Sequence, residues 1–272
     1  MFIATDLDGT LLTPSGTISA RSAAAIAAAE EAGVPVVPVT ARQLYGLDDL
    51  RSRLGRWALC SNGAVCWDLH AETVLFHLET SAEVASTFAR ELLAVEPRTR
   101  FASIQRDGAF FASQAGYADL CVFTDHHRDP ADMPRLGIEE VVGAPTLKLV
   151  ARHPSLSVQE LAAVARRLPS ASAVHITSSG AGMLEISAAG VTKSAGLQMF
   201  ADHLGMTGAD AVAFGDGEND VEMLRWAGRS WAVANAVPAA LEAAGKIAGS
   251  NAEDGVAQVI EELLEQRNAT VA

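Results

Sequence analysis

Positive charge is scarce in this sequence of 272 residues. Lys and Arg together number 20 against 33 Asp and Glu, which gives a formal net charge of −13 at pH 7. Nucleic acids and anionic membrane surfaces bind proteins through clustered basic residues. We therefore expect neither as a partner, and an anionic substrate has to find its positive charge locally.

Cysteine is also scarce, and long apolar runs are absent. The odd number of cysteines fits a reducing compartment better than a disulfide framework, and Cys60, Cys66 and Cys121 lack the paired close spacing of a zinc site. No apolar run is long enough to span a membrane, and the chain reaches Asp6 before the core of a signal peptide could form. These absences predict a cytoplasmic protein with no membrane partner.

The composition is that of a folded chain. Hydrophobic residues make up 49% and charged residues 19%, so a substantial core is expected and disorder is not. The length fits a core domain of ordinary size with a smaller companion better than one large domain. No internal repeat or low-complexity tract is evident, and nothing in the sequence indicates an oligomeric state.

The N-terminal stretch carries the first chemical signal. The apolar run Phe2-Ile3-Ala4 predicts a buried strand, and it leads into Asp6 and Asp8 followed by a Gly-Thr turn. If strand geometry persists, both carboxylates point to the same side, where they favour a cation such as Mg²⁺. An ionised Asp can also attack phosphorus without a base to activate it. The plain alternative is a surface turn, because Asp-Gly-Thr is a common way to leave a strand.

A βαβ unit follows this stretch. Ser19 is a plausible N-cap for a helix that runs through the Ala-rich segment to Gly33. Residues 34–39 then predict a second buried strand, which ends at Thr40. Because such units are right-handed and parallel, Thr40 should lie at the same carboxyl edge of the sheet as Asp6.

Residues 57–60 form a candidate third core strand, followed by Asn62 and Gly63. Asn-Gly at such a strand exit is either a simple turn or a substrate contact, and both interpretations stay open. Residues 65–68 and 74–77 then predict a small hairpin that leads out of the core.

The core pattern resumes near the C-terminal third of the chain. Lys193 begins a predicted helix, and a fourth core strand over residues 211–214 runs straight into Asp216, Asn219 and Asp220. The remaining predicted core elements are a fifth strand, a last short strand and a C-terminal helix, at residues 231–233, 247–248 and 255–267.

Between these parts, from about residue 81, the pattern changes to mixed helices and short strands. Ser157-x-x-Glu160 is a capping box that opens one of the helices, whereas residues 115–143 show no clear pattern. Strand-like runs occur at residues 101–104, 110–112, 146–151, 173–177 and 183–187. The sequence therefore predicts an α/β core made of residues 1–81 and 186–272, with residues 82–185 inserted as a separate α+β domain.

Four polar clusters follow buried strands or open helices, in the order Asp6/Asp8, Thr40, Lys193 and Asp216/Asn219/Asp220. Their order and context resemble the four motifs of the haloacid dehalogenase (HAD) superfamily. The Gly-Val-Thr-Lys and Gly-Asp-Gly-x-Asn-Asp forms resemble those of its Cof-type sugar-phosphate phosphatases. This resemblance implies a doubly wound, mainly parallel sheet with an inserted α+β cap domain. It also implies Mg²⁺-dependent hydrolysis of a small phosphorylated metabolite.

By this resemblance, Asp6 is the nucleophile that forms an aspartyl-phosphate. Asp8 protonates the leaving alkoxide and then activates water, so it has to carry a proton in the first step. Asp6, Asp216 and the backbone carbonyl of Asp8 would bind Mg²⁺. Asp220 either joins these metal ligands or orients the helix that follows.

The resemblance also assigns a phosphate site. Thr40 would donate to a phosphate oxygen, Lys193 would neutralise phosphate charge, and Asn219 would contact phosphate. The second motif of the family usually has Gly where this chain has Ala41, so a methyl group crowds an amide that is expected to bind phosphate. Further candidate substrate contacts are Arg42, Asn62 and Gly63.

Two rival functions stay open at this point. A phosphomutase of the same superfamily uses the same aspartyl-phosphate but returns the phosphoryl group to a sugar. A non-catalytic phosphate-binding or phospho-accepting module also uses an acidic cluster and a Lys at sheet edges, although it has no evident need of Asp8 or of the inserted segment.

Two weaker motifs are assigned no function. His126-His127-x-Asp129 is a poor metal site, because adjacent histidines point apart on a strand or a helix. Gly180-x-Gly182 lacks the strand-turn-helix setting of a nucleotide-binding loop.

Overall fold

The computed structural model describes residues 1–126, 128–178 and 182–271, and the chain in it folds into two compact units. The first unit comprises Met1–Ala41, Leu47–Phe76 and Thr192–Ala272, and the second comprises Arg42–Gly46 and His77–Val191. The main segment of the second unit extends a few residues beyond the inserted segment that the sequence predicts. His127 and Gly180 of the two weaker motifs lie outside the described residues.

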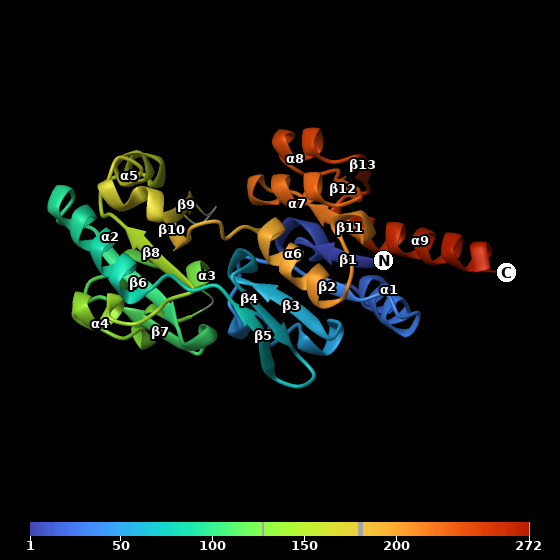
Figure 1. Cartoon of the computed structure of the whole chain (residues 1–272), viewed down its shortest axis with the longest axis horizontal. Coiled ribbons are helices and arrows are strands. Elements are labelled where there is room, and N and C mark those ends of the chain that lie inside the picture. The colour runs from blue at the N-terminus through green and yellow to red at the C-terminus, as the bar shows by residue number, and fades with distance from the viewer. Residues whose placement is uncertain (127, 179–181, 272) are drawn as a thin grey trace. The chain divides into compact units, whose positions relative to one another are not determined.

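The first unit contains a five-stranded parallel sheet with the strand order β13-β12-β11-β1-β2 (Figure 1). Its strands are β1 (Phe2–Thr5), β2 (Val36–Pro38), β11 (Ala211–Gly215), β12 (Arg229–Val233) and β13 (Lys246–Ala248). The chain order reverses between β1 and β11, because β2 continues on one side of β1 and β12 and β13 continue on the other. Ligands of open α/β sheets bind outside the carboxyl ends of the strands at such a switch point.

Helices cover both faces of this sheet, so the predicted α/β fold class is confirmed. The helices are α1 (Ala20–Glu31), α6 (Lys193–His203), α7 (Val221–Trp226), α8 (Pro238–Ala243) and α9 (Gly255–Val271). Side chains alternate along β1, and Phe2 and Ala4 pack in one core cluster with residues of α6, α7 and α8. Helices α1 and α9 pack together and are joined by the ion pair of Arg21 and Glu261.

The predicted third strand is present at residues 57–60, but it belongs to a different sheet from the one expected. β3 (Trp57–Cys60) pairs antiparallel with β4 (Val65–Asp68), and β5 (Thr73–His77) completes a separate three-stranded sheet. β3 also adjoins the parallel sheet just after β2, where Val39 and Leu59 form a parallel bridge and the Thr40 amide donates to the Leu59 carbonyl at 2.9 Å. The neighbouring strand β2 contains Pro38, which has no amide hydrogen to donate and therefore suits an edge strand.

The second unit is built on a five-stranded antiparallel sheet, with the strand order β7-β6-β8-β10-β9. The strands are β6 (Arg100–Gln105), β7 (Phe110–Ser113), β8 (Lys148–Arg152), β9 (Val174–Ser178) and β10 (Leu184–Ala188). Its helices are α2 (Ala82–Val95), α3 (Phe123–His126), α4 (Ile138–Val142) and α5 (Val158–Ala165). This is the α+β pattern that the sequence predicts for the inserted segment.

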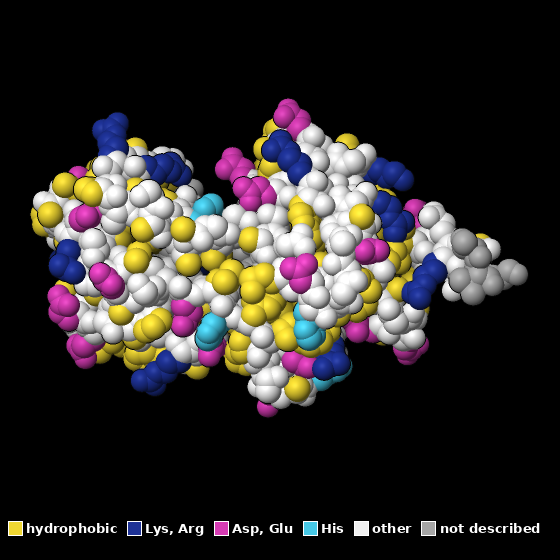
Figure 2. Space-filling model, in the orientation of Figure 1, with side chains coloured by type: hydrophobic (Ala, Val, Ile, Leu, Met, Phe, Trp, Pro, Cys, Tyr) yellow, Lys and Arg dark blue, Asp and Glu magenta, His cyan; other side chains and the backbone are white. Residues whose placement is uncertain are grey.

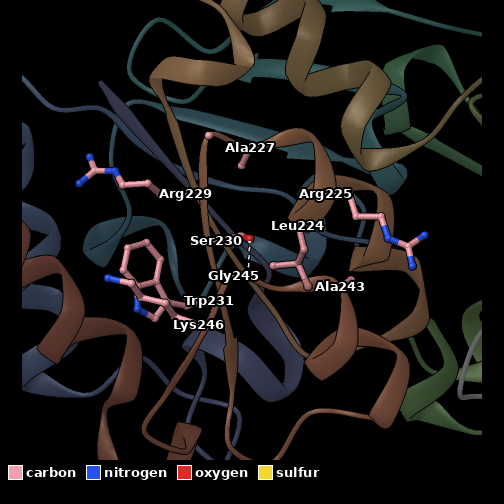
Figure 3. Close-up of a pocket in the computed structure, with 10 residues that line it drawn as sticks. Leu224, Arg225, Ala227, Arg229, Ser230, Trp231, Ala243, Gly245 and Lys246 are labelled. Carbon is pink, nitrogen blue, oxygen red and sulfur yellow. Dashed lines mark hydrogen bonds between the residues drawn. The ribbon is translucent and has the colours of Figure 1, made fainter.

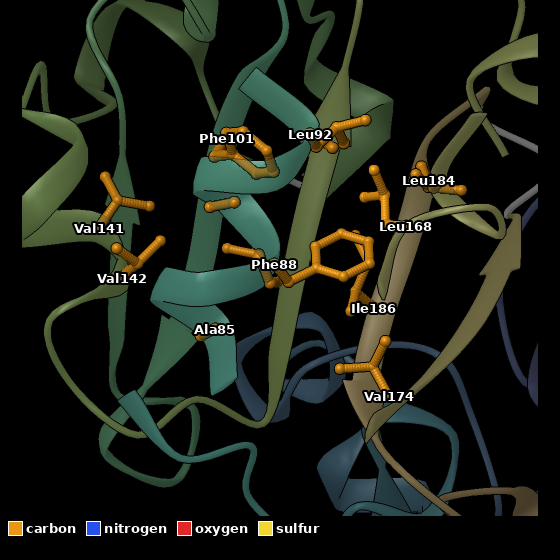
Figure 4. Packing of buried hydrophobic residues seen from close by; sticks show 14 of the residues in the cluster. Ala85, Phe88, Leu92, Phe101, Val141, Val142, Leu168, Val174, Leu184 and Ile186 are labelled. Carbon is orange, nitrogen blue, oxygen red and sulfur yellow. The ribbon is translucent and has the colours of Figure 1, made fainter. Parts of the chain in front are cut away.

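One hydrophobic cluster holds the second unit together. Phe88 and Leu92 of α2 lie over Phe101, Leu184 and Ile186 of the sheet, and all five are almost completely buried (Figure 4). Burying a large apolar side chain contributes about 1.5–3 kcal/mol to folding. The second unit therefore has a hydrophobic core of its own.

The two predicted helix caps are present. Ser19 accepts a hydrogen bond from the Ser22 amide at 2.9 Å, at the start of α1. At the start of α5, Ser157 accepts from the Glu160 amide at 3.2 Å, and the Glu160 carboxylate accepts from the Ser157 amide at 2.8 Å. Each cap satisfies amide groups that have no partner within the helix.

Charged side chains are spread over the surface. On the face that Figure 2 shows, Lys and Arg side chains lie singly or in small groups between acidic and uncharged ones. Over the described part of the chain, every helix is too short or too polar to span a bilayer.

The start of α6 is fixed by a close approach of two glycines. A Cβ at Gly63 would lie 2.7 Å from the carbonyl oxygen of Thr192, and one at Gly196 would lie 2.5 Å from that of Gly63. Gly63 also has a left-handed backbone with φ of 90°. The loop after β3 and the first turn of α6 can therefore pack together only because both positions lack side chains.

We predict that Gly63→Ala destabilises the protein by about 2–4 kcal/mol, through left-handed backbone strain and the clash with Thr192. Gly16→Ala is the matched control, because Gly16 has φ of 76° but open space around its Cβ position. It should cost only about 1 kcal/mol. Urea denaturation of both variants measures the difference, and equal losses would show that the contact with Thr192 does not matter.

Candidate active site

Three carboxylates converge at the carboxyl edge of the parallel sheet. Asp6 directly follows β1, while Asp216 follows β11 and Asp220 lies one turn further on. One oxygen from each of the three lies within 4.8 Å of the others. The predicted meeting of these three side chains at the switch point is therefore present in the structure.

Lys193 lies at the centre of this cluster. Its Nζ donates to Asp6 Oδ1 at 2.5 Å and to Asp220 Oδ1 at 2.7 Å, and its side chain is completely buried. Lys193 is the first residue of α6, whose N-cap Thr192 accepts from the Ala195 amide. The helix start thus places the ammonium group between two carboxylates.

Burial and charge act against each other at this pair. Burial raises the pKa of Asp6 above its ordinary value, while the positive charge of Lys193 acts to lower it. Burial also acts to lower the pKa of Lys193, but the charges of Asp220 and Asp6 outweigh it, so this pKa lies above its ordinary value. Lys193 therefore stays protonated and supplies the local positive charge that an acidic chain needs to hold an anion.

Asp220 already has partners for both of its oxygens. Oδ1 accepts from Lys193, and Oδ2 accepts from the backbone amides of Asp216 and Gly217 at 3.0 and 2.9 Å. These bonds hold the loop after β11 and aim the Lys193 ammonium at Asp6. The geometry favours the orienting role of Asp220 over the alternative role as a metal ligand.

Two residues that the sequence analysis did not assign support the same loops. Thr10 donates through its hydroxyl to Asp216 Oδ1 at 2.7 Å, and Asn235 donates to the carbonyl of Gly9 at 2.7 Å. Burial raises the pKa of Asp216, against the effect of the Thr10 hydrogen bond. The sequence places Thr10 in the turn after the first strand and Asn235 at the exit of a later strand. These positions were the available signals for a role near the site.

Asp8 is not one of the three converging carboxylates, although its negative charge acts on Asp216 and contributes to the raised pKa of that residue. The expectation that Asp6 and Asp8 share one side depends on a continuing strand, but β1 ends at Thr5 and the chain curls over Leu7–Leu11. Asp6 is buried, the Asp8 side chain is exposed, and its carboxylate is not part of the converging group. A general acid needs access to the leaving group, which an exposed position at the edge of the site permits.

The candidate phosphate contacts are brought together in part. Thr40 is buried at the exit of β2, and its carbonyl accepts from the Asn62 amide at 2.8 Å. Asn62 in turn accepts from the Asn219 side chain at 3.2 Å. Ala41 follows Thr40 as the last residue of its segment in the first unit.

Arg42 is assigned to the other unit. It belongs to the second unit, where its guanidinium donates to the carbonyl of Gly46 at 2.9 Å. Its predicted contact with substrate stays a prediction.

The donor set suits Mg²⁺. Asp6 and Asp216 offer carboxylate oxygens, and the converging group contains neither an imidazole nor a thiolate. Mg²⁺ prefers hard oxygen ligands and is usually held by one or two carboxylates together with substrate phosphate. Asp6, Asp216 and the backbone carbonyl of Asp8 would hold the ion.

A different pocket of the first unit lies near the amino ends of β12 and β13, away from the carboxylates. Arg225, Arg229 and Lys246 are among the residues that line it. Figure 3 shows Arg225 and Arg229 extending to opposite sides, and Lys246 lies over the ring of Trp231. Because the three cations do not converge, we assign no anion site to this pocket.

We predict that Lys193→Met lowers the free energy of unfolding by about 3–5 kcal/mol in the presence of a chelator, because two buried carboxylates lose their shared cation. Lys246→Met is the control, since this exposed lysine should contribute less than about 1 kcal/mol. Denaturation at pH 8 measures both variants, and equal stability of the two would contradict the assigned role of Lys193.

The free energy of unfolding that Lys193→Met loses should also depend on pH. Burial raises the pKa of Asp6 above its unfolded value of 3.8, and Lys193→Met removes the positive charge that opposes this rise. The folded variant therefore binds more strongly than wild type a proton that the unfolded chain has released. This contribution to stability is lost as the pH rises through the raised pKa. Lys193→Met should therefore be closer to wild type at pH 5 than at pH 8.

Comparisons with known proteins agree with this site. The family model of the haloacid dehalogenase-like hydrolases matches residues 3–260. The putative phosphatase YxeH of Bacillus subtilis (strain 168) is 29% identical over 273 residues, which cover 96% of this chain and 97% of that protein. The pyridoxal phosphate phosphatase YbhA of Escherichia coli (strain K12) is 28% identical over 267 residues, which cover 95% and 96%.

A solved structure shares the fold over nearly its whole length. It is that of an HAD subclass IIB sugar phosphatase, with a TM-score of 0.78 at 21% identity, covering 96% of this chain and 98% of that one. The family match spans both units and includes every residue of the converging carboxylate group. The chain belongs to the haloacid dehalogenase-like hydrolase family, and it is a phosphatase of that family.

Proposed function

We propose that this phosphatase hydrolyses a small phosphate monoester, such as a sugar phosphate, through a phosphoryl group carried transiently on Asp6. The observation that carries the proposal is the buried Lys193, which contacts Asp6 and Asp220 beside Asp216. A cation fixed against one carboxylate at a sheet switch point is suited to receive a phosphoryl group there. Its own charge offsets part of the charge on the transferring oxygens.

In the first step, an Asp6 carboxylate oxygen forms a bond to phosphorus as the bond to the ester oxygen breaks. Asp8 gives its proton to the departing alkoxide, which leaves as the alcohol. In the second step, Asp8 takes a proton from water, the water oxygen bonds to phosphorus, and the bond to Asp6 breaks. Inorganic phosphate leaves, and both aspartates return to their starting states.

The other residues hold the phosphate and the metal. Thr40, the amide at Ala41 and Asn219 are proposed to donate to phosphate oxygens, with Asn62 held against Asn219. Mg²⁺, when bound, supplies Lewis-acid stabilisation of charge on the phosphoryl oxygens. Lys193 stays protonated throughout, so it neutralises phosphate without taking part in proton transfer.

Substrate choice is proposed to lie in the second unit. Asp6, Asp8, Thr40, Lys193 and Asp216 all belong to the first unit, and the second has its own hydrophobic core. Relatives of this chain act on different phosphate esters: one is named for pyridoxal phosphate and a structural neighbour for sugars. This diversity fits a first unit that carries out the same reaction in each relative and a second unit that selects the substrate.

We predict that the two N-terminal aspartates fail in different ways. Asp6→Asn should remove turnover of every substrate, because the nucleophile is lost. Asp8→Asn should slow hydrolysis of an alkyl phosphate by roughly 100- to 10,000-fold. Because p-nitrophenolate leaves without a proton, a pre-steady-state burst of p-nitrophenol should survive in Asp8→Asn. Full activity in both variants would defeat these assignments.

We also predict that hydrolysis requires a divalent cation. A chelator-treated sample should release no phosphate, and added Mg²⁺ should restore release. Asp216→Asn should need more Mg²⁺ for half-maximal activity, whereas Asp210→Asn, an exposed aspartate elsewhere in the first unit, should match wild type. Undiminished turnover without metal, or an equal metal requirement in the two variants, would contradict the assigned ligands.

Finally, replacing residues 77–191 with a short Gly-Ser linker should leave chemistry but remove discrimination among substrates. The trimmed protein, checked for folding by circular dichroism, should hydrolyse an aryl phosphate. Against a panel of phosphorylated metabolites, its rates should differ far less than those of the whole chain. A folded, active trimmed protein that keeps the original ranking would place specificity in the first unit.

A further inference from the structure

A second group of metal-ligating side chains lies in the second unit. It consists of His77, Glu79 and Asp107, each of which has one ligand atom within 4.8 Å of the others. His77 ends β5 and is the first residue of the segment that enters the second unit. Asp107 lies in the turn between β6 and β7. The group therefore joins the start of this unit to a turn that is distant in sequence.

The backbone presents the three side chains to one another. His77 and Glu79 are two residues apart, just before Thr80 pairs with Thr146 in an antiparallel bridge. Side chains two apart on extended chain point to the same side. Asp107 has a left-handed backbone with φ of 55°, and its carboxylate contacts His77 Nδ1.

The charges in this group are unbalanced. One imidazole faces two carboxylates, and it forms an ion pair with Asp107. Across residues 1–126, 128–178 and 182–271, no donor makes a hydrogen bond to the Glu79 carboxylate, which is partly buried. Burial raises the pKa of Glu79. The charge of His77 acts to lower this pKa but does not outweigh burial, so a bound cation would complete the balance of charge at the Glu79 carboxylate.

We propose that His77, Glu79 and Asp107 form a binding site for a divalent transition-metal ion of the Zn²⁺ class. One nitrogen and two oxygen donors are the ligand set that Zn²⁺ accepts, with ligand distances of about 2.0–2.2 Å and water completing the shell. Mg²⁺ binds poorly here because it prefers oxygen donors alone. The site is separate from the Asp6 group, which contains only carboxylates.

A bound ion would fasten the entry of the second unit to its β6–β7 turn. Both the His77 and Asp107 side chains are exposed enough to rotate, at 49% and 36%. Small rotations are therefore sufficient to bring the three donors around one ion. The simple alternative is an isolated His77–Asp107 ion pair, in which Glu79 has no role.

The test is calorimetric titration of the metal-free full chain with ZnCl₂ at pH 7.5. Wild type, His77→Gln, Asp216→Asn and the double variant are compared, because Zn²⁺ also competes for the Asp6 site. We expect His77→Gln and Asp216→Asn each to lose a different binding event, and the double variant to lose both. Each substitution should weaken Zn²⁺ affinity at its own site by more than about tenfold. Even residues that only hydrogen-bond to metal ligands typically change metal affinity by about 10- to 100-fold when they are replaced.

Two further variants separate a metal site from an ion pair. Glu79→Gln should weaken Zn²⁺ binding in the Asp216→Asn background, whereas an ion pair alone would leave binding unchanged. His70→Gln, a change at an exposed histidine outside the group, should have no effect. Zn²⁺ binding that survives His77→Gln or Glu79→Gln in that background would overturn the proposal, and neither result depends on phosphatase activity.

Discussion

A buried ammonium group held between two carboxylates is the constraint on which the site depends. Lys193 has no exposed surface, and its contacts with Asp6 and Asp220 join the ends of β1 and β11 to the start of α6. An unpaired charge in such a place would be very unfavourable, so each of these elements has to stay where it satisfies the others. The same arrangement leaves a cation beside the proposed nucleophile before any substrate arrives, which is the preorganisation that phosphoryl transfer needs.

Several other residues of the first unit support the contact of Lys193 with Asp6 and Asp220. Gly63 and Gly196 let the loop after β3 approach α6, and Asp220 uses its second oxygen to hold the amides of the loop after β11. Thr10 fixes one oxygen of Asp216, which leaves the other available for a metal ion. On the proposed assignment, the chemistry is concentrated in one unit, and the other would be free to vary with the substrate. Such a division would account for the different esters named for relatives of this chain.

Local signals in the sequence were enough to predict the strands, the caps at Ser19 and Ser157, and the order of the polar clusters. They failed where geometry depends on distant contacts. The bond from Thr10 to Asp216 spans 206 positions, and no local pattern reports it. Asp8 is exposed and outside the three-carboxylate group, because β1 ends at Thr5 and Gly9 adopts φ of 87°. β3 pairs with β4 in a separate sheet and keeps a parallel bridge to the segment after β2, and an apolar run does not reveal which partner a strand will take.

The account rests on a phosphoryl group that resides on Asp6 during turnover. The direct measurement is to quench the reaction with acid within milliseconds, reduce the acyl phosphate with borohydride and map the product by mass spectrometry. An aspartyl phosphate reduced in this way becomes homoserine. The account predicts homoserine at position 6, dependent on substrate and Mg²⁺ and more abundant when Asp8 is replaced by Asn. Homoserine at another aspartate, or its absence during rapid turnover, would contradict the account.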